Sequence, residues 1–334
     1  MRKINSDRTI INWLYFSAFM VFCMAIIGAI TRLTESGLSM VEWRPLIGAI
    51  PPLSEAEWQR VFEIYQQTPE YQKKNSWMEL GDFKEIFFWE WFHRFWGRLI
   101  GLVYGLPLLY FWIRQQIPEG YKPRLFFILI LGGMQAVMGW YMVESGLVDR
   151  PSVSHFRLAA HLGLAFVIFG ALIWTAQDIE KRQTFQVTSG LKLLSWIGLY
   201  ILSITIIWGA YVAGMDAGLV YNEFPLMGGS FLPDDAVHIN PLWANFFQNP
   251  VAIQFMHRWL GILSFIVITA VHVLAMKQGI KTKDVFLLPV ITLIQVGLGI
   301  STLLSSVWLP LATLHQGTAL ILLGTYIIFL RRLS

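Results

Sequence analysis

Apolar residues occur along this chain in eight long stretches, and the connections between them carry most of the charged residues. Each stretch is about as long as a helix that crosses roughly 30 Å of hydrocarbon. The pattern therefore predicts an all-α integral membrane protein with eight transmembrane helices, rather than a large soluble helical enzyme. The expected spans are residues 11–31, 88–112, 124–143, 158–176, 193–213, 252–275, 285–304 and 312–330.

Composition and charge agree with this prediction. Only 14% of the 334 residues are charged, whereas soluble domains contain about 25%. Lys and Arg gather in both terminal segments and in every second connection, so they all fall on one side of eight spans. The positive-inside rule makes this side cytoplasmic. We therefore expect a multi-pass protein of the cell inner membrane with both termini in the cytoplasm. The net charge of +4 reflects this asymmetry, and we expect no nucleic-acid partner.

The two halves of the chain repeat each other. Residues 28–38 match residues 209–219 at a constant offset, and Gln135 and Gly139 are matched by Gln295 and Gly299. Each unit contains four spans, an even number, so the two copies share one orientation and a pseudo-twofold axis along the membrane normal. We predict two four-helix bundles, residues 1–180 and 181–334. The long outer segments, residues 33–86 and 215–250, are expected to cap them.

Four histidines lie near the outer ends of the spans at repeat-related positions. His93 and His257 each precede an arginine, while His161 and His315 each open a His-x-Gly-x-Ala motif. An imidazole facing hydrocarbon is costly unless something engages it. A single such histidine is more often hydrogen-bonded or interfacial, but the matched pairs favour metal ligation. Two facing imidazoles per half fit a haem better than zinc, which takes three or four ligands.

Three other histidines have no partner in the repeat, and we expect ordinary roles for them: His155, His238 and His272.

The halves differ at the residue three positions before the first histidine of each pair. Glu90 precedes His93, whereas Gln254 precedes His257. Residues three apart share a helix face, so Glu90 would lie beside whatever His93 binds. A buried carboxylate can accept protons or stabilise a developing cation, while an amide can only form hydrogen bonds. Glu90 could also form an ion pair with Arg94, and the two roles are compatible.

Both halves keep an arginine directly after that histidine. These residues, Arg94 and Arg258, either bind haem propionates or mark the membrane interface, and their retention in both halves favours propionates.

Together these motifs resemble the haem A synthase family over nearly the whole chain. The resemblance rests on the Glu-x-x-His-Arg sequence at 90–94, the second His-Arg at His257 and the paired His-x-Gly motifs within a duplicated four-helix unit. Residues 28–48 and 153–163 are similar to its proteobacterial and mitochondrial branch. Some bacterial members carry a cysteine pair in an outer loop, but this chain has only Cys23, within the first span.

The resemblance implies a membrane oxidoreductase that converts the C8 methyl of haem O to a formyl group by successive, water-dependent hydroxylations. The product, haem A, would serve cytochrome oxidase. It also implies that His93 and His161 hold the iron of the haem O substrate in residues 1–180, with Glu90 as the catalytic carboxylate. His257 and His315 would ligate the iron of a haem b cofactor in residues 181–334, where Arg258 would also contact the cofactor.

Two other functions fit part of this pattern. Four histidine ligands would equally suit a di-haem b-type electron-transfer protein, although such a carrier usually places its haems on opposite sides of the membrane. A transporter with parallel repeats would require broken helices or polar groups near the midplane. Besides haem O and membrane lipid, the synthase hypothesis is compatible with haem O synthase and cytochrome oxidase assembly proteins as partners, and with a homo-oligomer.

Overall fold

The computed structural model describes residues 2–43, 47–146 and 153–333, and this part of the chain is helical, with two isolated β-bridges in place of sheets. Eight of its helices are long and apolar enough to cross a membrane, as the sequence predicted. Their bounds are α1 (Arg2–Leu33), α3 (Leu80–Ile113), α4 (Lys122–Gly146), α5 (His155–Glu180), α6 (Ser189–Gly214), α8 (Pro250–Lys277), α9 (Lys283–Leu304) and α10 (Leu309–Leu330).

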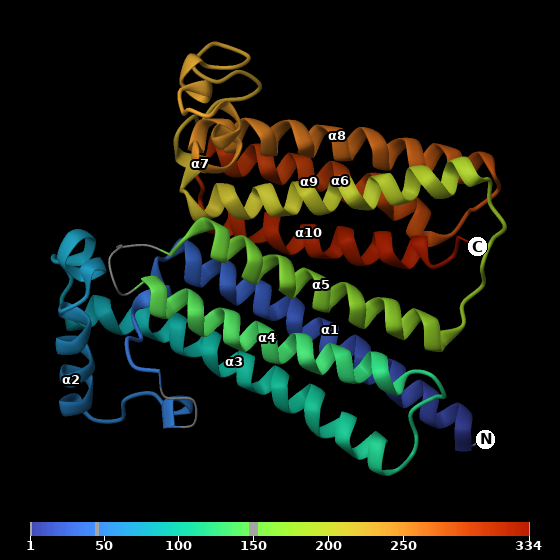
Figure 1. Ribbon diagram of the computed structural model, residues 1–334, viewed down its shortest axis with the longest axis horizontal. Coiled ribbons are helices and arrows are strands. Elements are labelled where there is room, and N and C mark those ends of the chain that lie inside the picture. The colour runs from blue at the N-terminus through green and yellow to red at the C-terminus, as the bar shows by residue number, and fades with distance from the viewer. Residues whose placement is uncertain (1, 44–46, 147–152, 334) are drawn as a thin grey trace.

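The long helices run side by side, with those of the N-terminal half on one side and those of the C-terminal half on the other (Figure 1). Helix α1 contacts α3 and α5, just as α6 contacts α8 and α10 in the second half. Between the halves, α1 contacts α10 and α5 contacts α6. Exchanging the two halves turns one of these contacts into the other, which is the reciprocity expected of a pseudo-twofold relation. Both chain termini lie at the end opposite the outer loops (Figure 1).

Three helices form the centre of this arrangement. About half of the most apolar stretch of each of α1, α5 and α10 is buried inside the protein, whereas a much smaller share is buried in the other five long helices. Large apolar side chains cover the outer faces of α3, α4 and α9 instead, with Leu109, Val137 and Leu293 among the most exposed. Exposed apolar faces of this kind suit contact with lipid, because large contiguous apolar patches are rare on soluble proteins.

Helix starts place the four histidines at different depths. α8 begins at Pro250, where the side chain of Asn249 accepts a hydrogen bond from the Val251 amide, and α10 begins at Leu309. His257 and His315 therefore lie about two turns inside their helices. α3 begins at Leu80, outside the expected span, so His93 lies more than three turns from its start. Helix α3 extends outward beyond the expected span 88–112 to join the first cap.

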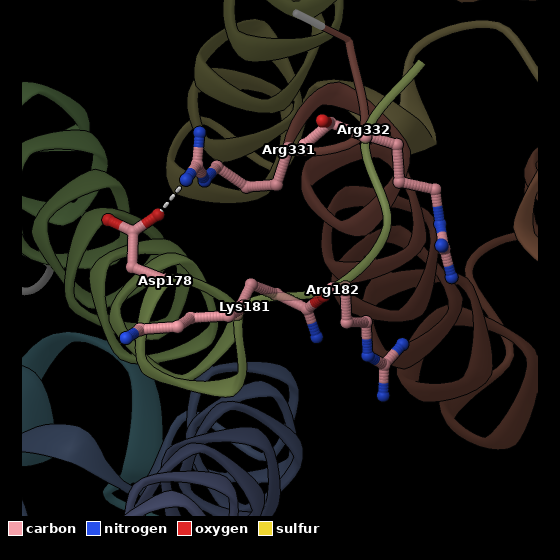
Figure 2. A pocket seen from close by; sticks show the side chains of 7 residues that line it. Asp178, Lys181, Arg182, Arg331 and Arg332 are labelled. Carbon is pink, nitrogen blue, oxygen red and sulfur yellow. Dashed lines mark ion pairs between the residues drawn. The ribbon is translucent and has the colours of Figure 1, made fainter.

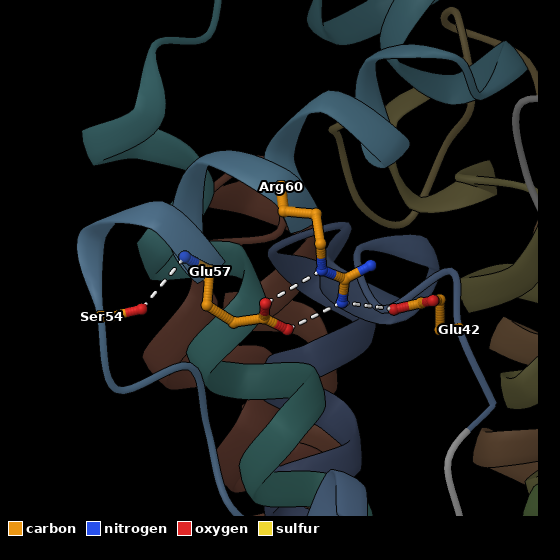
Figure 3. A network of polar contacts seen from close by, with 4 residues as sticks. All are labelled: Glu42, Ser54, Glu57 and Arg60. Carbon is orange, nitrogen blue, oxygen red and sulfur yellow. Dashed lines mark hydrogen bonds and ion pairs between the residues drawn. The ribbon is translucent and has the colours of Figure 1, made fainter.

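The first outer segment packs against this extension of α3. It contains α2 (Glu55–Gln66), whose first turn is capped by the Ser54 hydroxyl, and Arg60 forms ion pairs of 2.8 Å with both Glu57 and Glu42 (Figure 3). Burial of the apolar face of α2 stabilises the contact, through the cluster Met40, Phe62, Tyr65, Phe83, Ile86 and Phe87.

The second outer segment, which includes the short helix α7 (Asn245–Gln248), forms a smaller cluster of Met227, Ala236 and Val251. The described parts of both segments therefore pack as caps, as expected.

Candidate functional site

His257 and His315 face each other across the C-terminal half. Their ring centroids are 6.2 Å apart and their planes are nearly perpendicular, at 87°. The Nδ1 atom of His257 lies 3.1 Å from the Thr205 carbonyl, and that of His315 lies 3.1 Å from the Gln295 carbonyl. A carbonyl can only accept, so each Nδ1 carries the proton. Each Nε2 therefore keeps its lone pair for a metal, the tautomer seen in histidine ligands.

A glycine on a neighbouring helix holds each of the four rings. A Cβ built at Gly209 or Gly299 would lie 2.9 Å from Cε1 of His257 or His315, respectively. In the first half the matching distances are 3.1 Å between Gly28 and His93, and 3.2 Å between Gly139 and His161. Real Cβ atoms rarely tolerate such contacts, so these positions require glycine for packing, with no special backbone angle involved. The four membrane-spanning helices that carry no histidine, α1, α4, α6 and α9, thus each supply one glycine.

The histidines of the first half are held less firmly. No described residue forms a hydrogen bond with Nδ1 of His93 or of His161, although both atoms are buried. The Gln135 amide Nε2 lies 3.3 Å from Nε2 of His161 and donates to the His161 carbonyl at 3.0 Å. Gln135 thus contacts His161 through its side-chain amide, whereas its repeat partner Gln295 contacts His315 through its backbone carbonyl. In this half, one potential ligand nitrogen already has a hydrogen-bond partner.

Glu90 and Arg94 form a buried ion pair beside His93. The Arg94 Nε donates to Glu90 Oε1 at 2.6 Å, and the side chains are only 8% and 6% exposed. Arg94 also donates to the Met40 carbonyl at 3.0 Å, which ties the helix to the first cap. No described residue donates a hydrogen bond to the second carboxylate oxygen, Oε2. The pair therefore holds the carboxylate in place through one oxygen and leaves the other available.

The corresponding amide in the second half has both ends occupied. Gln254 accepts from Arg258 at 3.1 Å through its oxygen, and its nitrogen donates to the Tyr221 carbonyl at 3.0 Å. Arg258 donates to the carbonyls of Tyr221, Glu223 and Leu226 and so fastens the second cap. Its Nε is buried with no described partner, which leaves one donor for an anionic group such as a propionate.

The acidic positions matched in the repeat have a structural role. Glu35 and Asp216 both adopt a left-handed conformation, with φ of 53° and 51°, and each precedes a short 3₁₀-helix. Arg32 of the first half forms a 2.8 Å ion pair with Asp216 of the second, and Lys74 pairs with Glu35 at 3.0 Å. Arg32 thus joins the two halves at their outer ends.

The three histidines that have no repeat partner are each within hydrogen-bond distance of a backbone carbonyl: His155 of Phe247, His238 of Asp235 and His272 of Val285.

The chemistry of the site fits a haem. Among the described residues, no group of three or more His, Cys, Asp or Glu side chains could hold a bare metal ion. A centroid separation of 6.2 Å leaves room for one metal atom between His257 and His315, at about 2 Å from each nitrogen. Gly261, one turn after His257, has no atom within 4 Å of its would-be Cβ, and at Gly97 only Met24 lies nearby, at 3.5 Å. Both glycines leave space for a flat ring near the helix.

The chain is similar to known proteins over nearly its whole length. The model of the COX15-CtaA family, described as cytochrome oxidase assembly protein, matches residues 11–327. The chain belongs to this family. A protein from Rhodospirillum centenum named "Heme A synthase" is 49% identical over 97% of this chain and 88% of its own length. Proteins of the same name from Parvibaculum lavamentivorans and Wolbachia pipientis are each 44% identical over 96% of this chain and cover 93% and 96% of their own lengths.

Sequence reasoning missed the groups that orient the rings. The repeat had already matched Gly28 with Gly209 and Gly139 with Gly299, but it did not show that each glycine packs against a histidine of another helix. The signal was present, because all four occupy matched positions on the helices that lack these histidines. The carbonyls that accept from Nδ1 carry no signal in the sequence, since every residue has one.

Proposed function

We propose that this member of the COX15-CtaA family is a haem A synthase, which oxidises the C8 methyl of haem O to a formyl group. Relatives named "Heme A synthase" align with nearly all of the chain, and the lone buried carboxylate beside His93 supplies a reactive group in one half only. Its neutral counterpart, Gln254, is fully hydrogen-bonded. This difference between the halves carries the proposal.

We assign the C-terminal half to a haem b cofactor, with His257 and His315 as ligands. A haem held there would supply a redox-active iron for electron transfer. The protein groups around it are pre-arranged, because both imidazoles are fixed by backbone carbonyls and by glycines. The buried Nε of Arg258 is available to a propionate. Such firm contacts around the ligand side chains suit a resident cofactor rather than a molecule that must enter and leave.

We assign the N-terminal half to the haem O substrate, held through His93 and His161. Gln135 must then give up its contact with Nε2 of His161 when substrate binds, which suits a site that loads and unloads. Removal of electrons from the methyl carbon, which the haem b iron would pass on to an acceptor, leaves positive character on that carbon, and addition of the oxygen of water then releases protons. Glu90 accepts a proton or stabilises this charge through its free Oε2, while Arg94 holds Oε1 in place.

The proposed topology follows from the same repeat. The two four-helix units, residues 1–180 and 181–334, would share one orientation in the cell inner membrane, with both termini and the basic connections in the cytoplasm. Support comes from the reciprocal contacts of α1 with α10 and of α5 with α6. Haem O synthase and other cytochrome oxidase assembly proteins would be the partners for delivery and use of the haems.

Haem extraction from the purified protein, co-expressed with a source of haem O, tests the proposal. Wild-type protein should yield haem A or its hydroxylated precursor, together with haem b, on chromatography and mass spectrometry. The Glu90→Ala variant should retain haem but yield no oxidised product. Haem b in both sites despite abundant haem O would instead support a di-haem electron carrier.

A further inference from the structure

The end of the molecule that carries both termini contains two adjoining cavities between the halves. One, of about 270 Å³, lies where α5 ends and the C-terminal residues pass, and Asp178, Lys181, Arg182, Arg331 and Arg332 line it (Figure 2). The other, of about 460 Å³, reaches the start of α9. Arg182 and Arg332 line both cavities, so we treat the two together as one basic site. It lies far along the helices from the histidines and takes no part in the proposed chemistry.

This site holds more positive than negative charge. Asp178 forms ion pairs with both Arg331 and Arg124, and Asp284 pairs with Arg332 at 3.1 Å. The only other carboxylate in these pairs is Glu180, which binds Arg182 at 2.7 Å. Two carboxylates and six basic side chains line the two cavities, while Glu180 and Arg124 pair with lining residues but line neither cavity. The lining basic side chains with no ion pair to a described carboxylate are Lys181, Lys281 and Lys283.

The start of α9 adds polar groups that lack partners. Thr282 is the N-cap residue of this 22-residue helix, yet its hydroxyl makes no capping hydrogen bond. That hydroxyl oxygen is buried with no described partner. The same is true of Nε of Arg331, just after α10, and of Oδ2 of Asp284 in the first turn of α9. The hydroxyl and the guanidinium can donate to an anion, and the free backbone amides and the dipole of α9 also attract negative charge. The basic excess and these donors indicate the same ligand chemistry, a phosphate.

The wall of the larger cavity becomes apolar toward the membrane-spanning part of the protein. Leu287 and Ile328 line it on α9 and α10. Leu287 is 47% exposed and begins an exposed apolar stripe on α9 that continues through Val290 and Ile294 at helical spacing. A free phosphate gains nothing from such a wall, whereas acyl chains attached to a phosphate could lie along it.

We propose that this basic site binds the headgroup of an anionic phospholipid. The phosphate lies among Arg182, Arg332 and the start of α9, and the acyl chains follow the Leu287 stripe. Basic pockets between transmembrane helices are suited to such headgroups. The lipid would contact the linker after α5 on one side and α9 and α10 on the other. It would therefore stabilise the packing of this linker against α9 and α10, in addition to the bridge between Phe185 and Leu333.

Lipid binding to the full-length, haem-loaded protein tests this inference. The protein would be placed in phosphatidylcholine nanodiscs with or without cardiolipin, followed by native mass spectrometry of released complexes and thermal unfolding. We expect retained anionic lipid and a higher unfolding temperature with cardiolipin. The Lys281→Gln/Lys283→Gln variant removes two exposed, unpaired charges and should weaken retention at least about tenfold, since each basic residue contributes to headgroup binding.

A matched variant separates a specific site from general surface charge. Arg114→Gln/Lys122→Gln removes two charges from the connection between α3 and α4, at the same end but outside both cavities. It should retain lipid like the wild type. Equal loss in both variants, or equal retention in all three proteins, would overturn the proposal. Stabilisation of the same size by inorganic phosphate in pure phosphatidylcholine would replace the lipid with a soluble anion. None of these readouts depends on haem A formation.

Discussion

The two halves of this protein hold equivalent histidines in different ways. The difference suits one half to retaining a bound group and the other half to reacting with one. In the C-terminal half both imidazoles are oriented by backbone carbonyls, and a Cβ built on the glycine beside each would lie 2.9 Å from the ring. In the N-terminal half the matching distances are 3.1 and 3.2 Å, neither Nδ1 atom has a described partner, and Gln135 contacts one potential ligand nitrogen. Under the proposed assignment, a duplicated fold keeps one site rigid for a cofactor and leaves the other adaptable for a substrate.

Loss of a histidine ligand should have the largest effect on haem binding, and only in the half that loses it. His257→Ala should remove the low-spin haem b signal, with haem affinity reduced more than about 100-fold, because even outer partners of ligands are worth about 10–100-fold. His93→Ala should leave that signal intact and remove bound haem O. Visible spectra and haem extraction of the two variants provide the measurement. An unchanged haem b spectrum in His257→Ala would refute the assignment of the halves.

Substitution of the glycines that pack against the histidines should affect haem binding more in the C-terminal half than in the N-terminal half. Gly209→Ala places a methyl group 2.9 Å from the His257 ring, while Gly28→Ala places one 3.1 Å from His93. Overpacking of this kind costs about 1–3 kcal/mol. We expect haem b occupancy to fall about tenfold in Gly209→Ala. Gly28→Ala should change only substrate loading, and by less. Titration of haem into the purified variants measures both, and equal effects would remove the distinction.

The first cap should respond to pH. Burial, with smaller contributions from the carboxylates of Glu35 and Glu90, raises the pKa of Glu70 to about 7, although the hydrogen bond from Tyr65 and the charge of Lys74 lower it. The folded cap thus binds a proton that the unfolded chain releases near pH 4.5. Its stability is greatest below that pH and falls as pH rises through about 7, by up to about 3 kcal/mol.

Hydrogen exchange of residues 55–75 at several pH values should detect this change. The Glu70→Gln variant should show a flat profile. The second cap offers a natural control, since its buried polar residues include the neutral Asn245 and Asn249. A pH-dependent loss of protection of equal size in that cap would contradict the assignment to Glu70.

The smallest effect is expected at the ion pair between the halves. The Arg32 and Asp216 side chains are 22% and 52% exposed, so solvent screens their attraction. Arg32→Ala should lower the stability of the protein by less than about 1 kcal/mol and leave both haem sites unchanged. Thermal unfolding and haem spectra would measure this. Loss of haem from either half would show that Arg32 does more than join the caps.

The sequence was sufficient for the parts of the molecule that depend on local pattern. The eight helices follow from the length of the apolar stretches, and the histidine pairs follow from the repeat. The sequence did not predict the outward extension of α3, because residues 80–87 mix apolar with charged residues. The apolar face of this extension packs against α2 and not against lipid. Packing between helices, such as Gly299 against His315, depends on which helices are neighbours, and one sequence does not specify that.

The roles of the arginines also required the structure. Arg94 and Arg258 were expected at haem propionates because both halves keep them, yet most of their donors bind cap carbonyls and the neighbouring Glu90 or Gln254. A guanidinium serves carboxylates and carbonyls equally well, so the residue type alone could not distinguish these partners. Propionate binding through the remaining donor of Arg258 stays a prediction.

The most direct test of the asymmetry between the halves exchanges the two residues that define it. Glu90→Gln keeps the shape of the side chain and its hydrogen bond from Arg94 but removes the carboxylate, and Gln254→Glu makes the reverse change in the other half. Haem A formation should fall at least about 100-fold in Glu90→Gln, with total haem unchanged, and should continue in Gln254→Glu. Normal product from Glu90→Gln, measured by haem extraction and mass spectrometry, would contradict the account.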